Sequence, residues 1–316
     1  MAAKVSNILS SPISIRFFRF QQRHSNIPTS DSFTLLNLNR PSRFSAGIIS
    51  DSLGLRSYTT AVRRVCRDRT SVTASMLPEN PITRDVCVAT LTGCVALSLL
   101  RFWGEMAKLG ILEQKISRKL VHISVGLVFM LFWPLFSSGN QAAILAALVP
   151  GVNIIRMLLI GLGLWKDEAI VKSMSRYGDY RELLKGPLYY AATITLACAI
   201  YWRTSPIAIA AICNLCAGDG LADIVGRRFG SLKLPYNRNK SFAGSIAMTT
   251  AGFIASIMYM HYFSLFGLVH ESWEMVFGFF IVSLLTAVVE SLPISSELDD
   301  NLTVPLTSVL IGSFVF

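Results

Sequence analysis

Residues 218–245 have the sequence GDGLADIVGRRFGSLKLPYNRNKSFAGS, a charged stretch between two apolar segments. Its two carboxylates, Asp219 and Asp223, are four residues apart and follow directly on an apolar run. Carboxylates at membrane depth are costly and are rarely retained without a function. Because Mg²⁺ prefers oxygen ligands and usually takes one or two carboxylates plus substrate phosphates, we expect this pair to hold a magnesium ion.

The same stretch continues with two glycines and a run of cations. Glycine lets the backbone approach phosphate oxygens closely, and fixed cations offset the charge that spreads over a phosphoryl group during transfer. The pattern therefore predicts a magnesium–nucleotide site, with a solvated loop between two helices as the alternative. The glycines are Gly226 and Gly230, and the cations are Arg227, Arg228, Lys233, Arg238 and Lys240.

Composition indicates a membrane protein. Of 316 residues, 52% are hydrophobic and 15% are charged, whereas soluble domains have roughly a quarter charged residues. We expect an all-α fold, a polytopic membrane bundle of about seven or eight transmembrane helices. The fourth, fifth and eighth apolar segments are short, which suits tilted spans, re-entrant pieces or a broken hairpin. The segments cover about 86–103, 119–138, 141–164, 187–202, 205–218, 242–263, 275–292 and 302–316.

The N-terminus differs from the rest of the chain. Residues 1–76 contain 11 Lys/Arg against 3 Asp/Glu, and the remainder contains 18 against 16. This basic, Ser-rich segment lacks a secretory apolar core, so we interpret it as a plastid transit peptide, removed between about residues 55 and 76. A disordered basic tail that stays attached is the alternative. Because the basicity is confined here, nucleic-acid binding is not expected, and residues 77–316 form the membrane domain.

Charges also predict the topology. The links at about 101–119 and 165–186 and the central stretch each contain five Lys/Arg, whereas the intervening links contain none or Arg203 alone. The positive-inside rule puts the basic links on one face of the membrane. The last link, residues 293–301, then falls on that same face.

That last link is acidic. After Glu290 come Glu297, Asp299, Asp300 and Asn301, with no Lys or Arg. We expect this link to face the basic central stretch across a shared pocket, where its carboxylates bind Mg²⁺ or accept a hydroxyl proton. The alternative is a solvated turn whose aspartates cap the last helix.

Two further segments contain candidate site residues. Arg118 and His122 share one helical face, and the histidine has either a site role or a structural hydrogen bond. Residues 181–187 form a charged segment stopped by Gly-Pro, typical of an interfacial connector or a lid. Asn153 and Arg156 are polar at membrane depth, so they reach the basic face or line a cavity.

Several motifs together resemble one family. GDGLADIVGRRFG followed by KLPYNRNKSFAGS, RKLVHISVG from Arg118, ELLKGPLYY from Glu182 and VESLPISSELDDNLTVPL from Val289 resemble the plant plastid polyprenol kinases. That family includes phytol kinase and farnesol kinase. The strings FWGEMAKLGIL, WPLFSSG and NLCAGDG look closer to the farnesol kinase branch. The resemblance extends from about Leu77 to the end of the chain.

The resemblance implies an integral membrane kinase. It would phosphorylate the terminal hydroxyl of an isoprenoid alcohol, with farnesol favoured and geraniol, geranylgeraniol or phytol as alternatives. The donor would be CTP, UTP or ATP, with CTP or UTP frequent in the family. By position, Asp219 and Asp223 would hold Mg²⁺, and Asp300, Glu290 and His122 would be catalytic. The nucleotide would meet Gly226, Arg227, Gly230, Lys233, Lys240, Arg118, Lys119 and Asn301.

The physical setting agrees with this role. An isoprenoid alcohol partitions into a bilayer with ~0.8 kcal/mol for each buried CH₂, so a site at the membrane boundary takes the lipid laterally and the nucleotide from water. We expect a chloroplast membrane protein whose site faces the stroma. A cytidylyltransferase that leaves a CDP-lipid and a transporter or scaffold are the competing hypotheses.

Overall fold

The computed structural model describes residues 78–175, 178–293 and 298–316. The predicted transit peptide over residues 1–76 and the predicted acidic residue Glu297 lie outside the described residues. Within them the chain is almost entirely helical, as the composition predicts. The exception is an antiparallel hairpin of β1 (Lys233–Leu234) and β2 (Asn237–Ser241).

Helices account for nearly all of the described chain. Pro206–Phe229 is one continuous rod in which only the helical type changes, and Tyr180–Tyr201 is a second rod that is broken only at Lys185, where the backbone is not helical. The longer helices are α2 (Pro81–Lys108), α3 (Gln114–Leu131), α4 (Ala142–Gly161), α6 (Gly186–Leu196), α7 (Pro206–Cys213), α8 (Gly220–Phe229), α9 (Phe242–Leu265), α10 (Trp273–Ser291) and α11 (Asp300–Val315). The short ones are η1 (Trp133–Leu135), α5 (Glu168–Met174), η2 (Tyr180–Leu184), η3 (Ala197–Tyr201) and η4 (Asn214–Asp219).

Seven helices in the described residues are long and apolar enough to cross a membrane, and α11 is a shorter apolar helix of 16 residues. The prediction of a polytopic bundle with about seven or eight transmembrane helices is therefore confirmed. The fourth and fifth apolar segments looked short, but they belong to rods of 22 and 24 residues. They looked short because polar residues at the basic end continue each helix beyond its apolar run.

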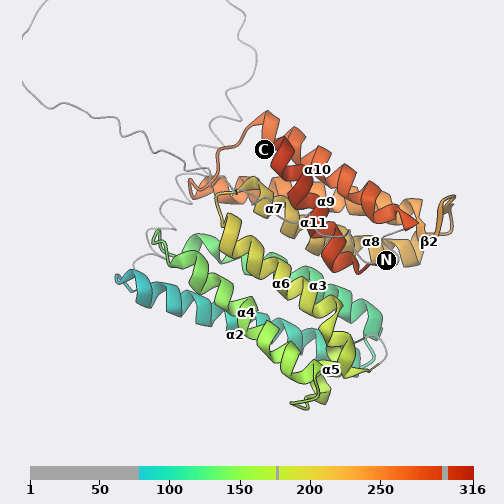
Figure 1. Cartoon of the computed structure of the whole chain (residues 1–316), viewed down its shortest axis with the longest axis horizontal. Coiled ribbons are helices and arrows are strands. Elements are labelled where there is room, and N and C mark those ends of the chain that lie inside the picture. The colour runs from blue at the N-terminus through green and yellow to red at the C-terminus, as the bar shows by residue number, and fades with distance from the viewer. Residues whose placement is uncertain (1–77, 176–177, 294–297) are drawn as a thin grey trace, which may run out of the picture. The chain divides into compact units, whose positions relative to one another are not determined.

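The helices pack in two groups (Figure 1). In the first group α2 packs on α3 and α4, and α4 packs on α6; in the second, α9 packs on the α7–α8 rod and on α10, and α10 packs on α11. The groups join where α11 meets α6 and where α3 meets η4 and α8. Glycines make the second junction close, because a Cβ on Gly220 would collide with Ile123 and a Cβ on Gly126 would collide with Cys216.

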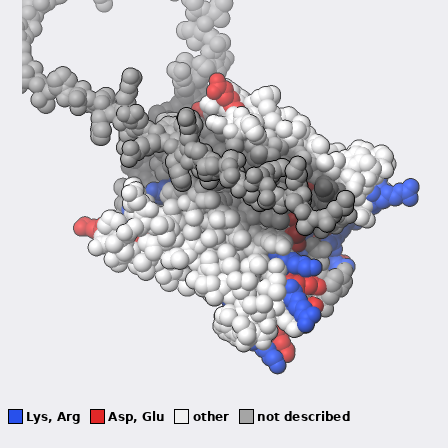
Figure 2. All heavy atoms as spheres, viewed as in Figure 1, with Lys and Arg blue, Asp and Glu red and all other residues white. Residues whose placement is uncertain are grey.

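Charged side chains gather away from the middle of the bundle. Figure 2 shows uncharged surface over the middle of α2 and α4, with Lys, Arg, Asp and Glu collected at the end where α5 lies. The opposite end has a buried polar anchor. There Asp85 accepts hydrogen bonds from the backbone N and the Oγ of Ser137, and Arg203 donates to the carbonyls of Trp133, Phe136 and Ser137.

The charged stretch that begins at Gly218 is not a solvated loop. Helix α8 carries it as far as Phe229, and the hairpin and the first residues of α9 complete it. The hairpin is tied to the end of α10, because the side chain of Asn237 donates to the carbonyls of Ser291 and Leu292. The charged stretch from Gly218 to Ser245 therefore consists of helix and hairpin at one end of the bundle.

Candidate active site

Asp219 stands at the end of a π-helical turn. This turn, η4, lies inside the α7–α8 rod, and such insertions within helices are frequent at functional sites. Asp219 is 3% exposed and Asn214, at the start of the same turn, is 1% exposed. The side-chain amide of Asn214 donates to Ser308 Oγ of α11 at 3.2 Å. The polar side of the rod thus faces α10 and α11.

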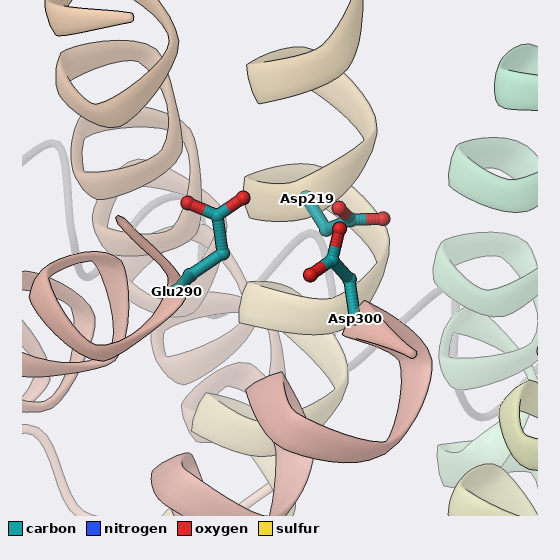
Figure 3. Close-up of side chains that lie close together, drawn as sticks. All are labelled: Asp219, Glu290 and Asp300. Atoms are coloured by element: carbon teal, nitrogen blue, oxygen red, sulfur yellow. The ribbon is translucent and has the colours of Figure 1, made fainter. Parts of the chain in front are cut away.

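Three carboxylates from three helices meet there. Asp219 from η4, Glu290 from the last turn of α10 and Asp300 from the first residue of α11 each offer an oxygen atom, and these atoms lie within 4.8 Å of one another. Figure 3 shows the carboxylates of Asp219 and Asp300 facing each other, with Glu290 reaching in from α10. Asp219 is level with the ends of α10 and α11, so α8 continues roughly 15 Å beyond this acidic triad.

Two lysines approach the acidic triad. Lys119 Nζ of α3 donates to Asp219 Oδ2 at 2.8 Å. Lys240 of β2 pairs with Glu290, and its Nζ lies 3.1 Å from Asp300 Oδ2. Burial alone would lower the pKa of Lys240, but the two carboxylates outweigh it and hold that pKa above the usual value for lysine. Lys240 is therefore a fixed cation in the working pH range.

His122 lies one turn beyond Lys119 on α3. Its Nε2 is 2.8 Å from the carbonyl oxygen of Leu215 and 3.5 Å from Asp219 Oδ2. A carbonyl can only accept, so Nε2 carries the proton that bonds it. Tyr190 packs on the imidazole with ring centroids 4.4 Å apart, and its hydroxyl donates to the His122 carbonyl at 2.7 Å. These contacts fix the orientation of His122 beside Asp219.

A cavity of about 310 Å³ opens beside the triad. Asp219 and Asp300 contribute to its wall, as do Arg118, Lys119 and Asn301. The cavity runs between the two helix groups and reaches α2, α4 and α5. Its remaining lining residues include Leu100, Val121, His122, Val125, Asn153, Met157, Met174, Glu182, Lys185, Gly186, Pro187, Tyr190 and Asp299.

The other predicted site residues lie on the projecting part of α8 and on the hairpin. Asp223 is outside the acidic triad, and its Oδ1 accepts from Arg227 Nε at 2.9 Å. Lys233 is exposed on β1. Gly226 and Gly230 face the start of α9, because a Cβ on either would press on the Ser241 hydroxyl. The structure thus brings Lys240 to the triad and leaves these five residues outside it.

Sequence reasoning missed three participants. Tyr190 and Lys185 lie in the ELLKGPLYY motif. The sequence predicted that this segment is a connector or a lid, but it assigned no role to either residue. Asn214 precedes Asp219 by five positions, a spacing that would leave an ordinary helix about 140° out of alignment and that only a π-turn brings to one face. A polar amide in the middle of an apolar run was the available signal.

The donor set of the acidic triad fits a hard divalent cation. Three carboxylates supply oxygen ligands of the kind that Mg²⁺ prefers. One of these atoms, Asp300 Oδ1, is buried without a hydrogen-bond partner among the described residues. An unsatisfied buried oxygen is costly, so an additional electropositive partner suits this position.

Comparison with known proteins yields close relatives. The chain is 55% identical over 311 residues to "Farnesol kinase, chloroplastic" of Arabidopsis thaliana, covering 98% of this chain and 94% of the relative. It is 68% identical over 242 residues to "Probable phytol kinase 3, chloroplastic" of Glycine max, covering 77% and 76%. It is 43% identical over 267 residues to "Phytol kinase 1, chloroplastic" of Arabidopsis thaliana, covering 84% and 86%.

No family model matches the chain, and no solved structure matches it. The curated relatives bear the names of both branches of the family, so their identities alone do not separate farnesol from phytol as the substrate. Each of these alignments covers most of this chain and most of the relative, at well above 30% identity. The chain belongs to the plant polyprenol kinase family, to which farnesol kinase and phytol kinase belong.

Proposed function

We propose that this chain is a membrane kinase that transfers a phosphoryl group from a nucleoside triphosphate to the terminal hydroxyl of an isoprenoid alcohol. Relatives named farnesol kinase and phytol kinase support this class. One observation carries the proposal: Asp219 and Asp300 of the acidic triad line a cavity together with Lys119, and the wall of that cavity also includes apolar side chains. Oxygen ligands, fixed cations and space for a lipid chain therefore adjoin one another, which is what phosphoryl transfer to a lipid requires.

Asp219, Glu290 and Asp300 would hold Mg²⁺, which would offset charge on the transferred phosphoryl group. This proposal replaces the pairing of Asp219 with Asp223, which is bonded to Arg227 one turn further along α8. In the structure Lys119 pairs with Asp219, and Lys240 pairs with Glu290 and Asp300, so two cations offset part of the triad's negative charge. When a cation occupies the carboxylates, the two ammonium groups become available to phosphate oxygens.

Asp300 is the better candidate for the base that accepts the hydroxyl proton. It lines the cavity, whereas Glu290 is not among the lining residues, although both carboxylates pair with Lys240. A base must reach the proton that it removes, so access to the cavity favours Asp300. His122 then orients Asp219 rather than accepting the proton, because its Nε2 is committed to the Leu215 carbonyl.

The nucleotide would reach the triad from the aqueous side, along the projecting part of α8 and the hairpin. Gly226, Arg227, Gly230 and Lys233 remain proposed contacts there, whereas Arg118 and Asn301, which the sequence also predicted as contacts, line the cavity instead. CTP, UTP and ATP are the candidate donors, and farnesol is the favoured acceptor. The names of the relatives support a chloroplast membrane, with the basic face and the site directed to the stroma.

The test uses membranes that contain the full chain. They are incubated with Mg²⁺ and γ-labelled CTP, UTP or ATP, and with farnesol, geranylgeraniol or phytol. We expect a labelled prenyl monophosphate, its loss on chelation with EDTA and its return when Mg²⁺ is restored. Label that returns equally well without a divalent cation would contradict the metal site.

The Asp219→Asn variant serves as the matched inactive control. Phosphoryl transfer by the wild type alone supports the kinase. A CDP-lipid formed from α-labelled CTP would identify a cytidylyltransferase instead. Folded protein that transfers nothing to any alcohol would overturn the proposal.

A further inference from the structure

We infer that the cavity beside the acidic triad is the binding site for the isoprenoid chain and that Met157 sets the length of chain it accepts. This inference rests on the proposed function and adds to it a substrate site and a specificity-determining residue. The nucleotide, by contrast, would be held outside this cavity, on the side of the hairpin.

The first argument is the gradient of polarity along α3. Arg118 and Lys119 line the cavity near the start of the helix, His122 follows, and Val125 lines it further in. Seven residues of helix from Arg118 to Val125 correspond to roughly 10 Å. An amphipathic alcohol matches such a wall, with its hydroxyl at the charged end and its hydrocarbon chain along the apolar part.

The second argument is charge. The cavity is lined by three Lys/Arg residues and by four carboxylates, which are Glu182, Asp219, Asp299 and Asp300. Lys119 is moreover engaged by Asp219. Away from the proposed metal ligands, Glu182 and Asp299 balance Arg118 and Lys185, so the wall offers a triphosphate no excess of cations but accepts a neutral alcohol. The exposed cations Arg227 and Lys233 lie instead on α8 and the hairpin, outside the cavity lining.

The third argument is the set of apolar side chains that line the cavity in the first helix group. Leu100 of α2, Met157 of α4 and Met174 of α5 line it and belong to a satellite hydrophobic cluster in the first helix group. Asp219 and Asp300 come from the second group, on the other side of α3 and α6 (Figure 1). A chain whose hydroxyl reaches Asp300 therefore runs toward these three side chains.

Met157 is the side chain best suited to limit that chain. It is 2% exposed, lies on α4, lines the cavity and is a buried member of the satellite cluster. Methionine is flexible and fills irregular gaps, so its truncation leaves space that an additional isoprene unit can use. A bulkier phenylalanine at this position would shorten the space.

The experiment measures kcat/KM for farnesol and geranylgeraniol with the full chain in membranes. Met157→Ala should raise the ratio of kcat/KM for geranylgeraniol to kcat/KM for farnesol by about fivefold or more. Met157→Phe should lower the same ratio by a similar factor. These factors are modest, because one methylene in an apolar pocket changes the discrimination between substrates by roughly 10- to 200-fold. The KM for the nucleotide should stay unchanged. The matched control is Met260→Ala, a buried methionine of α9 that does not line the cavity, and its ratio should equal that of the wild type.

The outcomes separate the two proposals. A wild type that phosphorylates no alcohol rejects the kinase itself. An active wild type whose ratio is the same in both Met157 variants overturns this inference alone, as does a change confined to the nucleotide KM. If the variants fail to fold, a photoreactive diazirine analogue of farnesol can be cross-linked to the wild type. We expect the analogue to label α3 and α4. Excess farnesol should suppress this labelling, and nucleotide should not. Labelling of other helices would overturn the proposed site.

Discussion

Lys119 on α3 and Asp219 at the end of η4 are 100 positions apart, yet the ammonium of one donates to the carboxylate of the other at 2.8 Å. Both side chains are largely buried, with 14% and 4% of their surfaces exposed. Removing such a pair from water costs free energy that the attraction barely recovers, so stability alone gives little reason to keep it. A functional requirement for both charges is the simpler explanation.

The acidic triad leads us to expect unequal effects at the two aspartates. Asp219→Asn should lower kcat by at least about a hundredfold, because it removes a charge that contacts the reacting groups. Asp223→Asn should lower it by less than about tenfold, since Asp223 pairs with Arg227 outside the triad. Prenyl monophosphate formation by purified, folded variants measures both. Equal losses would favour the alternative in which both aspartates hold the metal.

Replacing Lys240 should affect the nucleotide. Lys240→Met removes the cation that pairs with Glu290 and Asp300, and with it a proposed partner for phosphate oxygens. The apparent KM for the nucleotide should rise by about tenfold or more, with a smaller change for the alcohol. Lys166→Met, at an exposed lysine outside every proposed site, is the matched control. An effect restricted to the alcohol would argue against a phosphate role.

The raised pKa of Lys240 also predicts how stability depends on pH. The folded state binds this proton more tightly than the unfolded chain, so the stabilisation is fully present below the usual lysine pKa, about 10.4, and is lost only as the pH rises through the higher folded value. The difference in melting temperature between wild type and Lys240→Met should therefore be constant up to about pH 9 and should shrink above about pH 10.5. Thermal unfolding in detergent across both ranges measures it. A difference that stays constant above about pH 10.5 would mean that the folded state does not raise this pKa.

Much of the fold was predictable because few kinds of backbone structure can span a membrane. Long apolar runs must be helices, and the alternation of basic links indicated which helix ends share a face. The same alternation predicted that the acidic link would meet the central stretch, and the contact between Lys240 and Asp300 joins those two segments.

What the sequence could not supply was the rotation of each helix. Asp219 and Asp223 are four residues apart and looked like one pair, but the π-turn and the ends of α10 and α11 bring Glu290 and Asp300 to Asp219 instead. Likewise, only the packing of the helices shows that the Tyr190 ring contacts the imidazole of His122. These relationships depend on contacts across more than 60 residues of sequence, which no local pattern reports.

The polar anchor at the opposite end of the bundle should govern stability without affecting catalysis. Arg203 is 6% exposed and donates to three carbonyls of the segment that joins α3 to α4. Arg203→Met would leave those carbonyls without their donor and would remove a cation that interacts with the buried carboxylate of Asp85. Breaking such a buried charged network costs about 3–5 kcal/mol. The melting temperature should fall clearly, while the KM values of the remaining folded enzyme stay those of the wild type. A matched change at the exposed Arg228 should leave the melting temperature almost unaltered, and a shift in nucleotide KM in the Arg203 variant would mean that the two ends of the bundle are coupled.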